Sequence, residues 1–383
     1  MEKIMVVAGE ASGDMHAARV IEELKKLNPE LEFIGMGGQR MAEAGVELVY
    51  DPTKLSTIGF VEAVKHLRLM YRILDKLEQV MKEEEPAVIL LVDYSGFNMK
   101  VAKVAQRCGI PAVNYFAPSA WVWGQWRAKK MAKRDVTIAS VFPMEEEVYR
   151  QAGAEVEFVG HPILDIVNPD LDTTEFRRKY NLSSEQTIVG LLPGSRQQEI
   201  EQLLEPMLEA AYQLEEDYQG ELKFLLPVAD TITNSDLEAE IKRHDLDVEL
   251  ITGQSYQVMK VAALVLTASG TATLEAACFK TPLVIIYKTS LITYLLGKLL
   301  VKIPYVGLPN VIAEEEIVPE LLQGAVTGEK IADQALKILN SNSKQEEIKE
   351  QLDEVVERLG AEGAIKRVAN LVLATGGISN GTS

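Results

Sequence analysis

The chain has 383 residues, 47% of them hydrophobic and 25% charged, which is typical of a soluble globular protein with two average-sized domains. Its net charge of −18 argues against general binding to nucleic acid, and no apolar run reaches the roughly 20 residues of a transmembrane helix. Residues 1–8 are too short and too acidic for a signal peptide and predict a first strand. The two cysteines, Cys108 and Cys278, fall in predicted helices as core residues, so we expect a protein of the reducing cytoplasm.

Short runs rich in Val, Ile and Leu alternate with helix-length amphipathic segments, the pattern of parallel βαβ units. The first half predicts strands at 3–8, 32–36, 87–92, 111–115, 136–140 and 156–159. The second half predicts strands at 187–192, 222–227, 248–251, 263–267 and 282–287. Residues 161–172 contain two prolines and no clear period, so the domain boundary is expected there. The sequence therefore predicts an α/β fold of two Rossmann-like, doubly wound domains that face a cleft.

Two turns in the first half end predicted strands with an acid. In the turn Gly9–Asp14, the glycine spacing is not that of a dinucleotide-binding fingerprint, and Ser12 or Asp14 can cap the next helix. Glu10 has no evident capping role there, and an ordinary βα turn remains an equal alternative. Asp93 follows the apolar strand 87–92 and suits a general base if burial raises its pKa. The alternative is a loop aspartate that accepts hydrogen bonds from backbone amides.

Two turns in the second half suit an anionic ligand. Arg196 follows Gly194 after the strand 187–192, and its planar guanidinium matches phosphate oxygens. Its alternative is a surface ion pair with Glu199, one turn further on. The turn Ser269-Gly270-Thr271 exposes the first amides of a helix, where the helix dipole favours an anion. Glu275, in the first turns of that helix, is placed to reach a ribose hydroxyl. No Gly-Lys-Ser/Thr follows, so the turn is not an ATP-hydrolysing P-loop.

The sequence offers little support for a metal site. The pairs Asp170/Asp172 and Asp245/Asp247 resemble the Asp-x-Asp of metal-dependent sugar transferases, but neither pair ends an apolar strand. The four histidines are scattered without the spacing of metal ligands. His161, in the linker, is more simply read as a structural residue.

Three regions combine apolar and basic residues in an otherwise acidic chain. The helix expected at 60–77 presents a broad apolar stripe that includes Val64, Leu67 and Met70, with basic residues beside it. All three tryptophans, Trp121 and Trp123 among them, lie in a stretch from 94 to 134 that has no Asp or Glu. Residues 291–302 are again apolar and basic. We expect these patches to contact an anionic membrane surface and acyl chains, although a helix packed on its own sheet explains residues 60–77 equally well.

Read together, the turns resemble the lipid-A-disaccharide synthase family, inverting glycosyltransferases with the two-domain GT-B fold. The matching stretches occur in the family's order over residues 3 to about 330: Gly9–Asp14, Pro118–Trp123, Val159–Pro162, Leu192–Arg196, Ala268–Glu275 and Leu308–Asn310. The resemblance implies transfer of 2,3-diacylglucosamine from its UDP conjugate to 2,3-diacylglucosamine 1-phosphate, releasing UDP with no cofactor and no metal. It implies an acceptor and membrane-facing domain at 1–165, a UDP-sugar donor domain at 166–345, and a C-terminal helix within 346–383 that crosses back to the first domain.

The resemblance also implies a role for each candidate residue. Asp93 becomes the base for the acceptor hydroxyl, with Glu10 as a second candidate acid. On the donor side it implies UDP and diphosphate contacts for Arg196, Ser269, Gly270, Thr271, Glu275 and Asn310. Some relatives carry a second Asp at the position of Gly96, so this chain lacks an acid that they have.

Two other functions fit parts of the pattern. A UDP-sugar 2-epimerase shares the fold and binds UDP but has no use for membrane-facing patches. A non-catalytic peripheral membrane protein that binds a nucleotide sugar predicts binding without turnover. The expected partners are the two lipid-linked sugar substrates and an anionic membrane surface, with no nucleic acid and with a homodimer left open. The expected location is the cytoplasm, at the inner face of the inner membrane.

Overall fold

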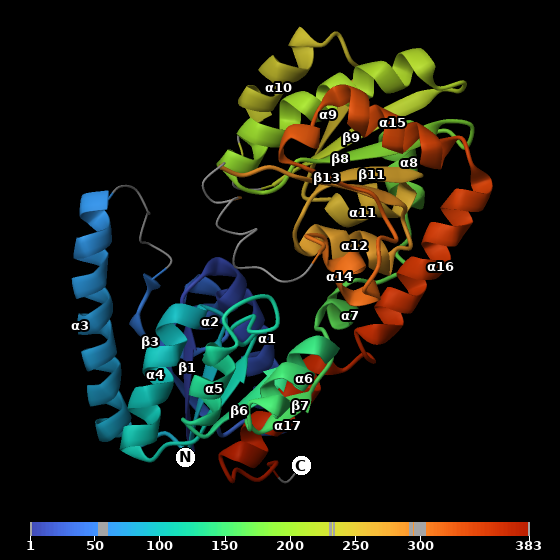
Figure 1. Cartoon of the computed structure of the whole chain (residues 1–383). Helices are drawn as coiled ribbons and strands as arrows, with labels where there is room; N and C mark the ends of the chain where they lie inside the picture. Colours follow the sequence, from blue (N-terminus) through green and yellow to red (C-terminus); the bar gives the residue numbers. More distant parts are fainter. Residues whose placement is uncertain are drawn as a thin grey trace. The chain divides into compact units, whose positions relative to one another are not determined.

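The computed structural model describes residues 2–52, 60–229, 232, 234–290, 294 and 304–381, with backbone alone at 60–67 and 234–236. The apolar and basic stretch 291–302 therefore lies outside the described residues, apart from Tyr294. The chain forms two compact units, each built on a parallel sheet (Figure 1). The first unit comprises Met1–Asp165 and Leu359–Ser383, and the second comprises Ile166–Arg358.

The first unit has a seven-stranded sheet in the order β3-β2-β1-β4-β5-β6-β7, with every pair parallel. The order reverses between β1 and β4, which makes their carboxyl ends the switch point where ligands bind in open α/β sheets. The strands are β1 (Lys3–Ala8), β2 (Glu32–Met36), β3 (Val46–Tyr50), β4 (Val88–Val92), β5 (Ala112–Tyr115), β6 (Val136–Ser140) and β7 (Val156–Phe158).

Helices cover both faces of this sheet because β1 and β4 are apolar on both sides. Ile4 and Val6 of β1 join one core with residues of α1 and α17. Met5 and Val7 point the other way into a core with residues of α3, α4 and α5. The helices are α1 (Ala11–Leu27), α2 (Gln39–Glu43), α3 (Phe60–Glu84), α4 (Ser95–Cys108), α5 (Trp126–Ala132), α6 (Pro143–Gln151), α7 (Ile163–Ile166) and α17 (Ala364–Thr375).

The second unit has a six-stranded parallel sheet in the order β10-β9-β8-β11-β12-β13. Its strands are β8 (Thr187–Leu192), β9 (Leu222–Val228), β10 (Val248–Thr252), β11 (Leu264–Ala268), β12 (Leu283–Tyr287) and β13 (Glu320–Leu322). Its helices are α8 (Thr174–Lys179), α9 (Gln197–Asp217), α10 (Asn234–Arg243), α11 (Ser255–Val261), α12 (Thr271–Cys278), α14 (Leu308–Ala313), the 3₁₀ turn η2 (Gln323–Ala325), α15 (Gly328–Leu339) and α16 (Asn342–Arg358).

All the predicted strands are present, and no end is displaced by more than one residue. The prediction missed β3 and β13, each of which lies at one edge of its sheet. Only the first residue of β3 is buried, and β13 has three residues, so neither gives a continuous apolar run. The single C-terminal helix expected within 346–383 is two helices, α16 and α17. Gly360 and Gly363 separate them with left-handed φ angles of 98° and 89°, which a helix cannot contain. Helix α17 packs on α1 within the first unit.

Candidate active site

Asp93 lies where β4 ends, at the switch point of the first sheet. Its Oδ2 accepts a hydrogen bond from the Ser12 hydroxyl at 2.9 Å, and its Oδ1 accepts one from the Tyr94 amide at 2.8 Å. The Asn98 side chain donates to the Asp93 carbonyl at 2.6 Å. Asp93 and Tyr94 both have left-handed backbones, with φ of 52° and 47°. Such strain persists only where surrounding contacts enforce it, and it is common at functional sites.

The turn after β1 supports Asp93 through two close approaches. A Cβ on Gly9 would lie 2.0 Å from the Tyr94 ring, so only glycine leaves room for this tyrosine. A Cβ on Gly13 would lie 3.3 Å from the Asp93 Cβ, which shows how closely helix α1 approaches the aspartate. The glycines of this turn are therefore explained by contact with the Asp93–Tyr94 segment.

Glu10 is exposed at the N-cap of α1 and makes no capping bond with its side chain. Burial and the nearby Glu10 charge together raise the pKa of Tyr94, so the structure brings Glu10 to the same corner as Asp93. The expectation that Ser12 or Asp14 caps α1 was wrong. Ser12 binds Asp93, and the buried Asp14 accepts from the Gly38 amide at 2.7 Å, at the start of α2.

Gly96, where some relatives carry an acid, is exposed in the first turn of α4. A Cβ there would meet no atom within 4 Å. An aspartate would fit at this position, so packing does not account for the glycine.

In the second unit, the turn at Ser269 joins β11 to α12. The Ser269 hydroxyl donates to the Val306 carbonyl at 3.0 Å, which fixes the turn against the chain before α14. Gly270 is exposed, and a Cβ on it would meet nothing within 4 Å. Thr271 is exposed and begins α12, so the first amides of this helix stand beside open space. The turn has the geometry of an anion site at a helix N-terminus.

Arg196 follows β8, the strand next to β11, so its loop and the Ser269 turn lie at neighbouring carboxyl ends. Its side chain is 79% exposed and pairs with Glu199 at 2.8 Å, which is the surface ion pair considered as the alternative. Glu199 also accepts from the amides of Ser195 and Arg196, at 3.0 and 3.2 Å, and thereby holds the start of α9. The pair leaves the guanidinium open to solvent and to an anion.

Glu275 lies on α12 and is mostly buried. It accepts a hydrogen bond from the Tyr256 hydroxyl at 3.2 Å, and burial raises its pKa although that bond lowers it. Asn310 is completely buried, and its amide makes four hydrogen bonds within the protein, including one to Glu320 at 2.9 Å. Glu320 in turn accepts from the amides of Val306 and Gly307, both at 2.8 Å. Asn310 therefore positions the segment that receives the Ser269 hydroxyl.

The residues expected at the membrane differ in how exposed their side chains are. The side chains of Val64 and Leu67 lie outside the described residues. Met70 is half-buried, and its sulfur accepts from the Tyr94 hydroxyl at 3.4 Å. Trp121 is half-buried with its ring 5.9 Å from that of Phe142, whereas Trp123 is 43% exposed.

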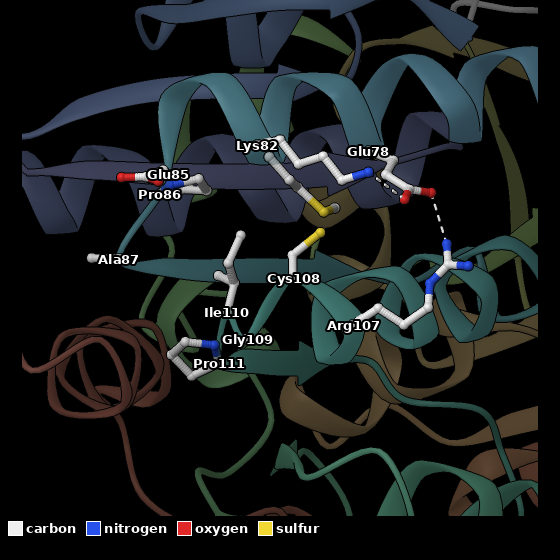
Figure 2. A pocket seen from close by; sticks show the side chains of 11 residues that line it. Glu78, Lys82, Glu85, Pro86, Ala87, Arg107, Cys108, Gly109, Ile110 and Pro111 are labelled. Carbon is white, nitrogen blue, oxygen red and sulfur yellow. Dashed lines mark hydrogen bonds and ion pairs between the residues drawn. The ribbon is translucent and has the colours of Figure 1, made fainter.

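A cavity of about 530 Å³ opens in the first unit, at the amino ends of β4 and β5 (Figure 2). Glu78 binds Lys82 at 2.9 Å and Arg107 at 2.7 Å along its wall, and Cys108 lies beside them. Asp93 follows the other end of β4, so this cavity is separate from the candidate active site.

Sequence reasoning missed several residues that build the site. Ser12 was considered only as a cap, and Tyr94, Tyr256 and Glu320 were not considered at all. Their roles depend on contacts between distant segments, which no local pattern indicates. Within the described ranges, no cluster of three or more His, Cys, Asp or Glu side chains has the arrangement of a metal site. Among the helices described, none is both long and apolar enough to span a bilayer.

Two parallel α/β units, each with polar side chains gathered at the carboxyl ends of its strands, define the two-domain Rossmann-like architecture of the GT-B fold. A family model described as lipid-A-disaccharide synthetase matches residues 4–374. The lipid-A-disaccharide synthase of Geobacter metallireducens is 39% identical over 372 residues, covering 97% of each chain. That of Geobacter sulfurreducens is 40% identical over 371 residues, covering 97% of this chain and 96% of the relative. The chain belongs to the lipid-A-disaccharide synthase family.

Solved structures with low sequence identity share the fold. The UDP-GlcNAc 2-epimerase from Neisseria meningitidis bound to UDP-GlcNAc has a TM-score of 0.66 at 14% identity, with 98% of this chain and 100% of that chain covered. CalG4, the calicheamicin glycosyltransferase, has a TM-score of 0.63 at 13% identity, with 98% of each chain covered. Epimerases and transferases both appear among these neighbours, so they establish the architecture and not the reaction.

Proposed function

We propose that the enzyme condenses UDP-2,3-diacylglucosamine with 2,3-diacylglucosamine 1-phosphate to give lipid A disaccharide 1-phosphate and UDP. Membership of the lipid-A-disaccharide synthase family supports this reaction. The observation that carries the mechanism is Asp93, a carboxylate at the switch point of the first sheet, held by the Ser12 hydroxyl and the Tyr94 amide.

In this mechanism Asp93 takes the proton of the acceptor hydroxyl as its oxygen attacks the anomeric carbon of the donor sugar. The bond from that carbon to the UDP oxygen breaks, and attack from the opposite face inverts the anomeric configuration. Two hydrogen bonds fix the carboxylate before the acceptor arrives, so little orientational entropy is lost in reaching the transition state. Glu10, at the same corner, is the second candidate acid and would orient the acceptor.

On the donor side, UDP leaves with a diphosphate that carries the developing negative charge. The amides at Gly270 and Thr271 would bind its oxygens at the start of α12. The Ser269 amide donates to the Ile286 carbonyl at 3.1 Å, so Ser269 would contribute by holding the turn in place. Arg196 would add a guanidinium from the neighbouring strand end, exchanging part of its contact with Glu199 for the phosphate.

Glu275 would bind the ribose through the carboxylate oxygen that Tyr256 does not occupy. Asn310 would act through Glu320 and the segment at Val306, because its own amide is already fully hydrogen-bonded. The proposed transfer uses no metal ion and no cofactor.

We place the enzyme in the cytoplasm, bound peripherally to the inner face of the inner membrane, because its proposed substrates carry acyl chains. Three exposed aromatic rings support this location: Tyr71 on α3 is 48% exposed, Trp126 at the start of α5 is 50% exposed, and Trp123 in the loop before α5 is 43% exposed. Each ring lies under a cation, with Lys100, Arg127 and Lys130 at 4.3, 3.9 and 4.2 Å from the ring centres. Aromatic rings beside basic groups suit the headgroup region of an anionic bilayer.

The reaction is tested by incubating the purified enzyme with both lipid substrates and following disaccharide and UDP together. Supply of UDP-GlcNAc alone tests the epimerase alternative, which predicts a 2-epimer without any acceptor. Binding of UDP-diacylglucosamine with no turnover in the presence of acceptor would favour the non-catalytic binder.

A further inference from the structure

Five aromatic side chains form a continuous row in the first unit. The His16 and Phe116 rings are 4.4 Å apart, and Phe116 stands 6.0 Å from His161. The row continues from His161 to Phe142 at 5.1 Å and from Phe142 to Trp121 at 5.9 Å. These separations are those of favourable ring contacts, so the five residues form one connected surface.

The sheet topology places this row beside Asp93. Phe116, Phe142 and His161 follow β5, β6 and β7, which are the next strands in order after β4. The Asp93 amide donates to the carbonyl of Tyr115, the residue before Phe116, at 3.0 Å. Phe116 has a left-handed backbone with φ of 53°, which is costly for a bulky residue. The row therefore runs along the carboxyl edge of the sheet, from the strand beside the proposed base to β7.

The row carries no net charge near neutral pH. Burial, together with the nearby Arg19 charge, lowers the pKa of His16 to about 4. Burial and the neighbouring His16 lower the pKa of His161 to about 3. The Ile163 amide donates to Nδ1 of His161 at 3.1 Å, so the ring proton of neutral His161 is on Nε2. His16, Phe116, Phe142 and Trp121 are only half-buried and retain exposed surface.

We propose that this row is the platform on which the acceptor sugar lies, with the apolar C–H face of the pyranose against the Phe116, Phe142 and Trp121 rings. The inference rests on the proposed function and extends it to acceptor selection. A sugar on the row stands next to Asp93, where its hydroxyl can lose a proton. An uncharged aromatic surface suits a sugar flanked by acyl chains and offers no counter-charge to a nucleotide diphosphate.

Trp121 provides a direct reporter for this platform. Replacing Trp123 and Trp126 with Phe leaves Trp121 as the only tryptophan of the chain. We expect its fluorescence to change saturably on titration with a soluble short-chain 2,3-diacylglucosamine 1-phosphate and to stay unchanged with UDP. A response to UDP that equals the response to the acceptor would overturn the assignment.

Phe142→Leu tests the contribution of one ring in the otherwise wild-type enzyme. The KM for the acceptor should rise about tenfold, as expected for loss of one aromatic contact, while the donor KM and kcat stay within about twofold. The matched control is Tyr212→Leu, which removes an exposed ring from α9 in the second unit and should change none of these three constants. If Phe142→Leu does not fold, Trp121→Leu makes the same test.

The outcomes separate this inference from the reaction. A wild-type enzyme that forms no disaccharide while Trp121 still responds to the acceptor contradicts the reaction and supports the platform. An enzyme that forms disaccharide, with a silent Trp121 and an unchanged acceptor KM in Phe142→Leu, overturns the platform. Equal rises in the donor and acceptor KM would also overturn it, because they indicate general damage to the fold.

Discussion

Replacing Asp93 with Asn should abolish most of the turnover while leaving the fold and UDP binding intact. Asp93 has a φ of 52°, and asparagine is among the few residues that tolerate the left-handed region. The Asn side-chain oxygen can still accept from the Ser12 hydroxyl or the Tyr94 amide, so the substitution removes the charge and basicity with little change in shape. Asp93→Ala would put alanine in the left-handed region and remove the hydrogen-bond acceptor, so backbone strain would add to the loss of the base.

The expected loss follows from the role assigned to the carboxylate. General-base catalysis contributes roughly 10²–10⁴ in rate, which corresponds to about 2.7–5.5 kcal/mol of transition-state stabilisation. Ser12→Ala removes one hydrogen bond to the same carboxylate, and because that bond is exposed we expect only about a tenfold loss.

The assay measures kcat for disaccharide formation together with the UDP dissociation constant by calorimetry. Asp135→Asn is the matched control, because Asp135 also has a φ of 52° but is exposed at the amino end of β6, at the opposite edge of the sheet from Asp93. An Asp93→Asn enzyme that keeps more than about a tenth of wild-type kcat would refute the assignment of Asp93 as the base. Loss of UDP binding together with kcat would indicate damage to the fold instead.

Burial raises the pKa of Glu145 from 4.5 to about 7, so its contribution to stability is present below pH 4.5 and is lost as pH rises through about 7. As the pH rises through that window, the free energy of unfolding of Glu145→Gln should therefore increase relative to that of the wild type by up to about 3 kcal/mol. Urea unfolding of both proteins at pH 5 and pH 8 measures this difference. A difference that is the same at both pH values would contradict the raised pKa. Replacing Trp123 and Trp126 with Ser should weaken flotation with anionic vesicles several-fold, while Tyr212→Ser should not. Equal effects of the two changes would contradict a membrane contact by Trp123 and Trp126. Turnover should survive EDTA, and activity that EDTA abolishes and Mg²⁺ restores would contradict the metal-free reaction.

The sequence predicts most of the fold because buried parallel strands are unbroken apolar runs. β1 and β4 are apolar on both faces, and the turns after them begin with glycine or with an acid. The outermost strands β3 and β13 lack this signal, since β3 is half-exposed and β13 is too short. The sequence also could not show that the helix expected near the C-terminus is interrupted, because glycine alone does not reveal its φ angle.

The candidate site could be predicted in part. Asp93 and the Ser269 turn were found because each directly follows a strongly apolar strand. Ser12 and Glu320 became visible only in three dimensions, since each acts on a segment distant in sequence. Asn310 shows a limit of the resemblance. The resemblance implied that Asn310 contacts the ligand, but its side-chain amide makes hydrogen bonds within the protein.

The measurement that tests the central claim most directly is a single incubation of the purified enzyme with UDP-2,3-diacylglucosamine and 2,3-diacylglucosamine 1-phosphate. We expect equal amounts of disaccharide 1-phosphate and UDP, with the anomeric configuration of the donor sugar inverted, and a loss of about a hundredfold or more in Asp93→Asn. UDP release or sugar epimerisation with no disaccharide would contradict it.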